Sequence, residues 1–180
     1  MGRLSHVATD EIVAGANYRL FPAFGLETRQ RERGVLPYQH IKALIEVGHI
    51  FAEVPISEAQ LQPASLDLRL GSTAVQVRAS FLPGKDMTVL EAAESLTLEH
   101  IDLSGGAVLH AGSVYIIPLM ESLSLPDKLS AAANPKSSTG RVDVFARLIT
   151  DRGERFDSIG RGYSGRLFLE VSPKSFSVRV

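Results

Sequence analysis

The feature that most limits the possible folds is a long succession of short β-type runs that begins at Ser65. Over residues 65–70 leucine alternates with polar residues, which is the period-two pattern of a half-buried strand. Further runs rich in valine, isoleucine, leucine and phenylalanine follow, separated by turns that contain glycine or proline. These runs lie at residues 75–77, 114–117, 142–148, 167–171 and 176–180. Many short strands in succession predict an all-β sandwich or barrel.

One short helix is predicted before the strands. Pro37 fits the first helical position, where its missing N–H costs nothing. Ile41, Leu44 and Ile45 recur at helical spacing, and Gly48 suits a C-terminal cap. The sequence therefore predicts a mainly β fold with a single short N-terminal helix.

Two segments of different character are expected along the chain. Residues 1–33 have weak periodicity and end in the charged run 29–33, so we expect a solvated N-terminal extension or an arm that packs on a neighbouring subunit. Residues 34–180 are expected to form one domain. The sequence ends inside the strand pattern of residues 175–180, so we expect the natural protein to continue and this domain to be truncated at its C-terminal end.

The composition excludes several classes of protein. The chain contains no cysteine, so it can form neither disulfides nor cysteine-containing zinc sites. Its five histidines are scattered, which argues against a histidine-rich metal site. A formal net charge of -1 gives no general basic field, so a nucleic-acid partner is not expected. No long apolar run or signal-peptide core is present, so we expect no membrane span and a cytoplasmic location.

The segment 136–141 is the first candidate site. Lys136, Ser137, Ser138 and Arg141 lie close together in the sequence, next to a glycine. Cations, hydroxyl groups and the accessible backbone N–H groups near a glycine can together surround a phosphate chain. The Gly-x-x-x-x-Gly-Lys pattern of a Walker loop is absent. The same residues are equally compatible with a polar surface turn.

Glu170 is the second candidate. Leu167, Leu169 and Val171 share one face of the predicted strand, which leaves Phe168 and Glu170 on the opposite face. Burial of a carboxylate on an otherwise apolar strand is costly. Two interpretations follow. The pattern alone favours the solvent side of an outer strand, and the alternative is a pocket suited to proton transfer.

Two further patterns carry less weight. Ser65, Asp67 and Arg69 share one face of their predicted strand, and a solvent-facing surface is favoured there over a wet site or a subunit interface. Residues 160–165 match Gly-x-Gly-x-x-Gly, but a β-type run follows where a dinucleotide site requires a helix. The dinucleotide interpretation is therefore rejected.

Taken in order, these segments resemble the dCTP deaminase family, part of the larger dUTPase-like group. Residues 36–46 with 62–71 are similar to its opening helix and first motif, and Glu121–Leu129 to the approach to its second motif. Residues 136–141 are similar to its basic-Ser-Ser-x-x-Arg motif, and residues 162–170 to the segment that ends in its catalytic glutamate. The sequence of residues 134–147 is closer to the longer, two-domain members.

This resemblance implies a distorted jelly-roll sandwich that forms trimers with sites between subunits. It implies hydrolytic deamination of dCTP to dUTP and ammonia, which supplies dUTP for dTMP synthesis. Lys136, Ser137 and Ser138 would then hold the triphosphate, and Arg141 would lie beside the base. Glu170 would be the general base and acid, with Ser137 and Arg141 as further catalytic candidates, and Asp157 would hold the sugar. Magnesium would arrive with the triphosphate, and no zinc would take part.

Two other functions remain open. A dUTP diphosphatase, or a bifunctional dCTP deaminase and dUTPase, would use the same fold. The other alternative is a non-catalytic half of a larger protein, retained for nucleotide binding or oligomerisation.

Overall fold

The structure is a computed structural model that describes residues 34–180. Within these residues the chain forms two compact units. The first ends at Val47 and resumes over Ser57–Asp67, and the second comprises Gly48–Ile56 and Leu68–Val180. The predicted N-terminal extension lies outside the described residues, and the predicted division of the chain at residue 34 stays a prediction.

The first unit contains the predicted N-terminal helix. Its elements are α2 (Tyr38–Glu46), the 3-10 helix η1 (Glu58–Gln60), β2 (Leu61–Gln62) and β3 (Ser65–Leu66). Pro37 precedes α2 instead of occupying its first position, because the ψ angle of Pro37 is 167° and its backbone is extended. Its carbonyl accepts hydrogen bonds from the N–H groups of His40 and Ile41. Gly48 lies just beyond the helix with a φ of 77°, as a C-terminal glycine requires.

The strand predicted over residues 65–70 is mostly wrong. Only Ser65–Leu66 is a strand, and Leu70 makes an isolated bridge with Leu119. The physical reason lies at Arg69, whose backbone N–H donates to the side chain of Glu121 at 2.8 Å and not to a neighbouring strand. The alternation of leucine with polar residues predicted a regular ladder of backbone hydrogen bonds. In the structure a hydrogen bond to the Glu121 side chain takes the place of one of them.

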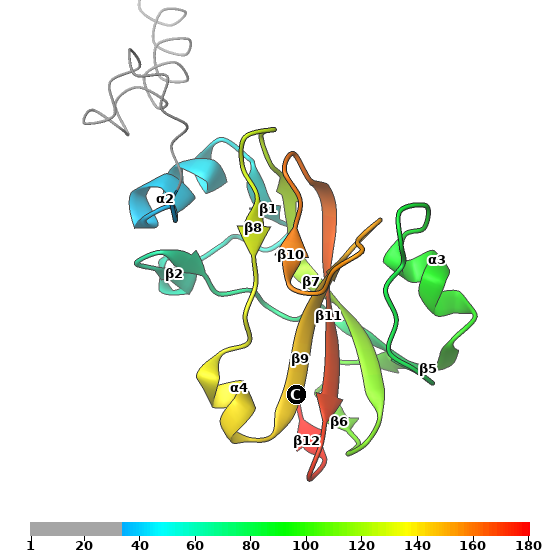
Figure 1. Cartoon of the computed structure of the whole chain (residues 1–180). Coiled ribbons are helices and arrows are strands. Elements are labelled where there is room, and N and C mark those ends of the chain that lie inside the picture. Colours follow the sequence, from blue (N-terminus) through cyan, green and yellow to red (C-terminus); the bar gives the residue numbers. More distant parts are fainter. Residues whose placement is uncertain (1–33) are drawn as a thin grey trace, which may run out of the picture. The chain divides into compact units, whose positions relative to one another are not determined.

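The second unit is built on a six-stranded antiparallel sheet in the order β5-β4-β7-β11-β9, with β1 also paired to β7 (Figure 1). Its strands are β1 (Ile50–Ala52), β4 (Thr73–Val77), β5 (Thr97–Asp102), β7 (Val114–Ser124), β9 (Val144–Thr150) and β11 (Ser164–Pro173). Two small antiparallel pairs accompany it: β6 (Val108–Leu109) with β12 (Val178–Arg179), and β8 (Ala131–Ala132) with β10 (Ser158–Ile159). The predicted mainly β fold class is confirmed, and β11 follows the glycine-rich segment where a dinucleotide site would need a helix.

Both faces of the central sheet are buried. Ile116 of β7 belongs to a core cluster with Val75, Ile149 and Phe168 on one face. Its neighbours Tyr115 and Ile117 belong to a second cluster, which also includes Ala74 and Val171. A strand that is covered on both faces has a nearly continuous apolar sequence, as residues 114–117 do.

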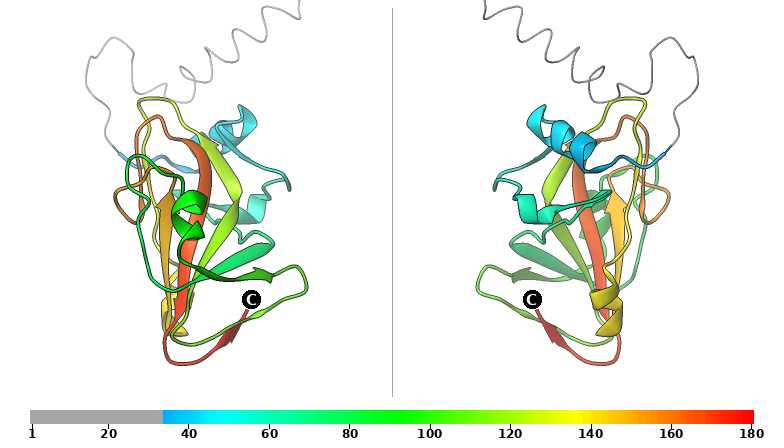
Figure 2. Two further views of the ribbon diagram at one scale, coloured as in Figure 1. Left: turned by 90° about the vertical axis from the view of Figure 1, so that its right-hand side faces the viewer. Right: turned by 90° about the vertical axis from the view of Figure 1, so that its left-hand side faces the viewer.

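A second helix, α3 (Val89–Glu94), covers one face of this sheet (Figure 2). Its buried residues Val89 and Ala93 pack in the cluster that contains Phe168. Thr88 and Glu91 form a capping box at its start. The prediction of a single helix was therefore wrong, although this Thr-x-x-Glu signal was present in the sequence. A third helix, α4 (Ser137–Arg141), precedes β9.

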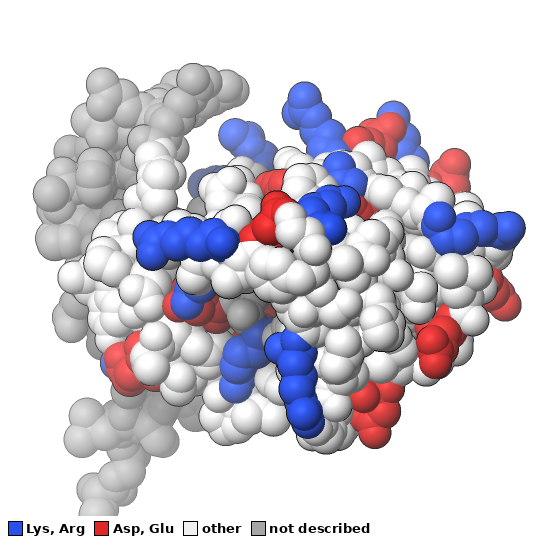
Figure 3. Space-filling model, turned by 90° about the horizontal axis from the view of Figure 1, so that it is seen from below, with Lys and Arg blue, Asp and Glu red and all other residues white. Residues whose placement is uncertain are grey.

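The surface carries both signs of charge. Lysine and arginine side chains are interspersed with aspartate and glutamate over the face shown in Figure 3, in keeping with the formal net charge of -1. Among residues 34–180, the helices are too short or too polar to span a bilayer.

Candidate functional site

Glu170 lies in the middle of an inner strand of the central sheet. β11 runs between β7 and β9, and Glu170 is opposite Ile116 on one side and Arg147 on the other. The residue is only 1% exposed. The interpretation that placed this carboxylate on the solvent side of an outer strand is therefore wrong. The face of the sheet that carries Phe168 is covered by the core cluster that includes Val89 and Ala93 of α3, so Glu170, on the same face, points into the protein interior.

The cation beside this carboxylate is Arg147. Its Nη2 and Nε atoms both donate to Oε1 of Glu170, at 2.6 and 3.1 Å. Nη2 also donates to the Ser80 hydroxyl at 2.7 Å. The guanidinium lies 3.6 Å from the ring centroid of Phe156 and 4.8 Å from that of Phe145. Three hydrogen bonds and two aromatic rings thus hold this side chain.

The second carboxylate oxygen of Glu170, Oε2, differs from the first in its hydrogen bonding. Oε2 is buried and has no hydrogen-bond partner among the described residues. Leaving a charged acceptor buried without a donor costs free energy, so a native protein retains such a group for a reason. An unoccupied carboxylate oxygen in an apolar surrounding can accept a proton from a water molecule. The geometry at Oε2 therefore suits general-base chemistry.

The residues predicted to bind phosphate lie on or beside α4. Lys136 precedes this helix, and Ser137, Ser138 and Arg141 belong to it. All four are exposed. The segment is thus a short helix that precedes Val144, the first residue of β9.

The structure does not bring α4 to Glu170 within one chain. No hydrogen bond or ion pair joins Ser137, Ser138 or Arg141 to Glu170 in the part of the chain that the structure describes. The cation that contacts the carboxylate within this chain is Arg147, and the sequence did not single it out. The functional roles of Lys136, Ser137, Ser138 and Arg141 stay predictions.

Asp157 lies beside the outer edge of β9. It is hydrogen-bonded there to Leu148, the residue that follows Arg147. Its Oδ1 accepts from the backbone N–H of Leu148 at 2.7 Å, and its own N–H donates to the Leu148 carbonyl at 2.9 Å. Its φ angle is 58°, in the left-handed region that aspartate tolerates. Asp157 therefore closes the edge of β9, and its predicted contact with a sugar stays a prediction.

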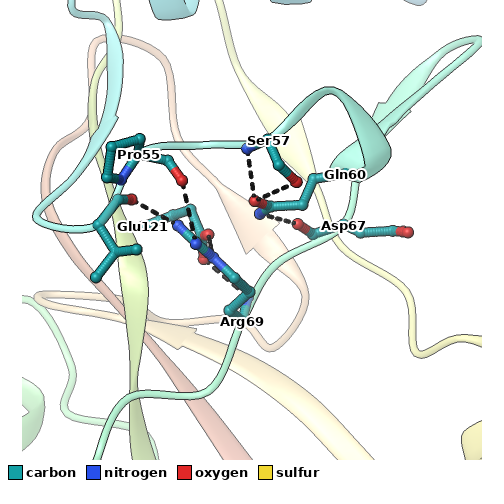
Figure 4. Close-up of polar contacts among 7 residues, drawn as sticks. Pro55, Ser57, Gln60, Asp67, Arg69 and Glu121 are labelled. Carbon is teal, nitrogen blue, oxygen red and sulfur yellow. Dashed lines mark hydrogen bonds and ion pairs between the residues drawn. The ribbon is translucent and has the colours of Figure 1, made fainter.

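A second buried carboxylate, Glu121 on β7, was missed from the sequence. Glu121 has an exposed fraction of 0%. Its Oε1 accepts from Nε of Arg69 and its Oε2 from the backbone N–H of Arg69, both at 2.8 Å. The same guanidinium donates to the carbonyls of Val54 and Pro55, at 2.8 and 3.3 Å (Figure 4). The solvent-facing placement favoured for Arg69 is therefore wrong.

Figure 4 also draws polar contacts of the other compact unit. Gln60 donates through Nε2 to the Asp67 carbonyl at 2.9 Å and accepts at Oε1 from the Ser57 N–H at 3.0 Å. Asp67, the other polar residue of the predicted strand face, also accepts from Nε2 of Gln62 at 3.1 Å. These hydrogen bonds join Asp67 to residues of its own compact unit.

Among residues 34–180, no group of three or more histidine, aspartate or glutamate side chains is arranged to hold a metal ion.

Comparison with known proteins gives a consistent family. Residues 32–180 match the family described as the 2′-deoxycytidine 5′-triphosphate deaminase (DCD) N-terminal domain. The chain is 31% identical over 132 residues to a "dCTP deaminase, dUMP-forming" of Coprothermobacter proteolyticus, which covers 73% of this chain and 67% of the relative. It is 28% identical to a "dCTP deaminase" of Haloarcula marismortui, over 71% of this chain and 64% of that protein.

A solved structure supports the same fold. The 2′-deoxycytidine 5′-triphosphate deaminase of Agrobacterium tumefaciens superimposes with a TM-score of 0.79 at 52% sequence identity. The match covers 82% of this chain and 44% of the Agrobacterium chain. The chain thus spans less than half the length of that protein and roughly two thirds of the two curated relatives named above.

Proposed function

The chain belongs to the 2′-deoxycytidine 5′-triphosphate deaminase family, and from that premise we propose that it deaminates dCTP hydrolytically to dUTP and ammonia. The observation that carries this proposal is the carboxylate of Glu170, which is 1% exposed and has one oxygen without a partner among the described residues. A general base needs such an oxygen, placed where bulk water does not compete for it.

The proposed reaction consumes one water molecule. Oε2 of Glu170 takes a proton from water as the water oxygen bonds to C4 of cytosine. The carboxylic acid gives this proton to N3 of the ring. The carboxylate then takes the second proton from the new C4 hydroxyl and delivers it to the amino group, so that the C4=O bond forms, the C4–N bond breaks and ammonia departs. Glu170 ends the cycle ionised, as it began. Positioned proton transfer of this kind contributes about 10²–10⁴-fold to a rate.

The remaining contribution comes from groups that fix the nucleotide. In the proposal Lys136, Ser137 and Ser138 bind the triphosphate, Arg141 lies beside the base, and Asp157 holds the sugar. Mg²⁺ enters as part of the substrate, bound to phosphate oxygens. Because α4 is exposed and makes no bond to Glu170 of its own chain, we propose that α4 of one subunit completes the site of a neighbour in a trimer.

The product decides between two related activities. Relatives named "dCTP deaminase, dUMP-forming" and "dCTP deaminase" both match this chain. A bifunctional enzyme would hydrolyse dUTP further to dUMP and diphosphate, and this is the second candidate function. A cytoplasmic location also stays a prediction.

The test is incubation of the chain with dCTP and Mg²⁺, followed by chromatographic separation of dCTP, dUTP and dUMP and by an ammonia assay. The proposal predicts dUTP and ammonia in equal amounts. Appearance of dUMP with diphosphate would establish the bifunctional alternative. Binding of dCTP without ammonia release would identify the chain as a non-catalytic nucleotide-binding half.

A further inference from the structure

We propose that Arg147 is the positioning residue for Glu170: it holds Oε1 so that Oε2 is the oxygen that receives the proton. This inference rests on the proposed function of Glu170 as the general base. It concerns a residue that neither the sequence motifs nor the family resemblance singled out.

The register of the sheet brings the two side chains together. Arg147 on β9 is directly opposite Glu170 on β11, so both project from the same face of neighbouring strands. Two N–H groups of one guanidinium converge on a single oxygen, Oε1, at 2.6 and 3.1 Å. The carboxylate plane is thereby fixed with its other oxygen directed away from the cation.

The guanidinium is itself held in place. Phe156 lies 3.6 Å and Phe145 4.8 Å from its central carbon, measured to the ring centroids, and the Ser80 hydroxyl accepts from Nη2 at 2.7 Å. A planar guanidinium stacks on aromatic rings while it donates several hydrogen bonds in its own plane, which an ammonium group cannot do. The arrangement is therefore specific to arginine.

Because Oε1 of Glu170 already accepts hydrogen bonds, Oε2 is the oxygen that can accept a proton. Oε1 already accepts two charge-assisted hydrogen bonds, so its lone pairs are less available to a proton than those of Oε2. A carboxylate freed from Arg147 would rotate and present either oxygen in several orientations. Loss of orientation at the reacting group costs rate even when substrate binding is unchanged, and a misplacement of 1 Å can cost about 10²-fold.

The experiment uses Arg147→Ala with and without added guanidinium chloride at millimolar concentration. We expect kcat for dCTP to fall about 10- to 100-fold, while KM changes less than about threefold. Added guanidinium should occupy the position of the lost side chain, beside the Phe156 ring, and restore a large part of kcat. Arg147→Lys keeps the charge but not the planar contacts, so its kcat should lie between those of Arg147→Ala and the wild type. Arg166→Gln, an exposed arginine on β11, is the matched control and should keep wild-type kcat.

A crystal structure of Arg147→Ala provides a readout that does not depend on activity. We expect the Glu170 carboxylate to leave its wild-type orientation and to return to it when guanidinium is soaked in. Where Arg147→Ala fails to fold, as judged by circular dichroism, Arg147→Lys serves for both measurements.

The outcomes separate this inference from the proposed function. Wild-type kcat in Arg147→Ala, or an unchanged Glu170 orientation in its crystals, would overturn the positioning role alone. A kcat lost together with thermal stability and not restored by guanidinium would also overturn it, because a merely structural contact behaves in that way. Deamination by Glu170→Gln at the wild-type rate would instead refute the proposed function.

Discussion

Two buried glutamates on central strands of the same sheet each pair with one arginine, yet the hydrogen bonds that their carboxylate oxygens accept differ. Glu121 on β7 uses both oxygens, one for the Arg69 side chain and one for the Arg69 backbone N–H, at 2.8 Å each. Glu170 on β11 uses only Oε1, and its Oε2 has no partner among the described residues. The arginines are similarly placed, with 27% and 25% of their side chains exposed.

The difference lies in the backbone. The bridge between Leu70 and Leu119 brings the chain at Arg69 alongside β7, so the backbone N–H of Arg69 donates to Oε2 of Glu121. Glu170 lies between two strands whose N–H groups donate to the carbonyl groups of the sheet, so no backbone donor is available to its side chain. A buried carboxylate whose two oxygens both accept hydrogen bonds links segments of the fold, whereas one with an oxygen that accepts none is available for chemistry.

The largest effect on stability is expected from Glu121→Gln. In either orientation the amide would direct its NH₂ group at a donor of Arg69, because both oxygens of Glu121 accept from that residue. The free energy of unfolding should fall by about 3–5 kcal/mol, as measured by urea denaturation. A loss below about 1 kcal/mol would contradict the view of Glu121 as a closed structural link.

Arg69→Gln should destabilise the protein less, by about 1–3 kcal/mol, because the backbone N–H of residue 69 still donates to Oε2 of Glu121. The carbonyls of Val54 and Pro55 also lose their donor. Amide hydrogen exchange over residues 50–56 should therefore accelerate more than exchange in β11. Equal acceleration in both segments would show that Arg69 does not act locally on the 54–55 segment.

Gly162→Ala tests how much the turn before β11, the strand that carries Glu170, contributes to stability. Gly162 has a φ of +66°, and a Cβ there would lie 2.7 Å from Oδ1 of Asp127. We expect the free energy of unfolding to fall by about 1–2 kcal/mol in thermal melts. Gly160→Ala is the control, because a Cβ at Gly160 would meet nothing within 4 Å. A Gly162→Ala variant as stable as Gly160→Ala would show that this turn relaxes freely.

The smallest effect concerns pH. Burial, followed by the Asp151 carboxylate, raises the pKa of Tyr163 from 10.0 to about 12. The unfolded chain therefore releases this proton first, so stability present below pH 10.0 declines as the pH rises toward 12. Tyr163→Phe should lack this part of the alkaline decline in urea denaturation at a series of pH values. Parallel curves for the two proteins would refute the shift.

Much of the sheet could be predicted from local sequence, because β7 and β11 have apolar runs that suit strands covered on both faces. Glu170 attracted notice as a single charge on such a run. Arg147 did not, since 13 residues lie between β9 and β11 and no spacing rule fixes the register across such a connection. Glu121 was missed for a related reason, since its partner Arg69 is 52 residues away in the sequence.

The burial of Glu170 also depended on long-range information. A two-residue alternation shows which side chains share a face, but it does not show whether a further strand lies alongside. Pairing with β9 made β11 an inner strand, and the core cluster that includes α3 covers the face on which Glu170 lies. Helix α3 is different, because its capping box was visible and the helix could have been predicted.

The most direct test of the central claim is Glu170→Gln, assayed for ammonia release from dCTP and for urea denaturation beside Glu121→Gln. Its amide oxygen can accept the Arg147 bonds, and its NH₂ replaces an oxygen that had no partner. We predict an unfolding free energy within about 1 kcal/mol of the wild type. We also predict retained dCTP binding and a rate at least about 10²-fold lower. Near-normal ammonia release, or a loss of stability as large as that of Glu121→Gln, would contradict the assignment of Glu170 as the reactive carboxylate.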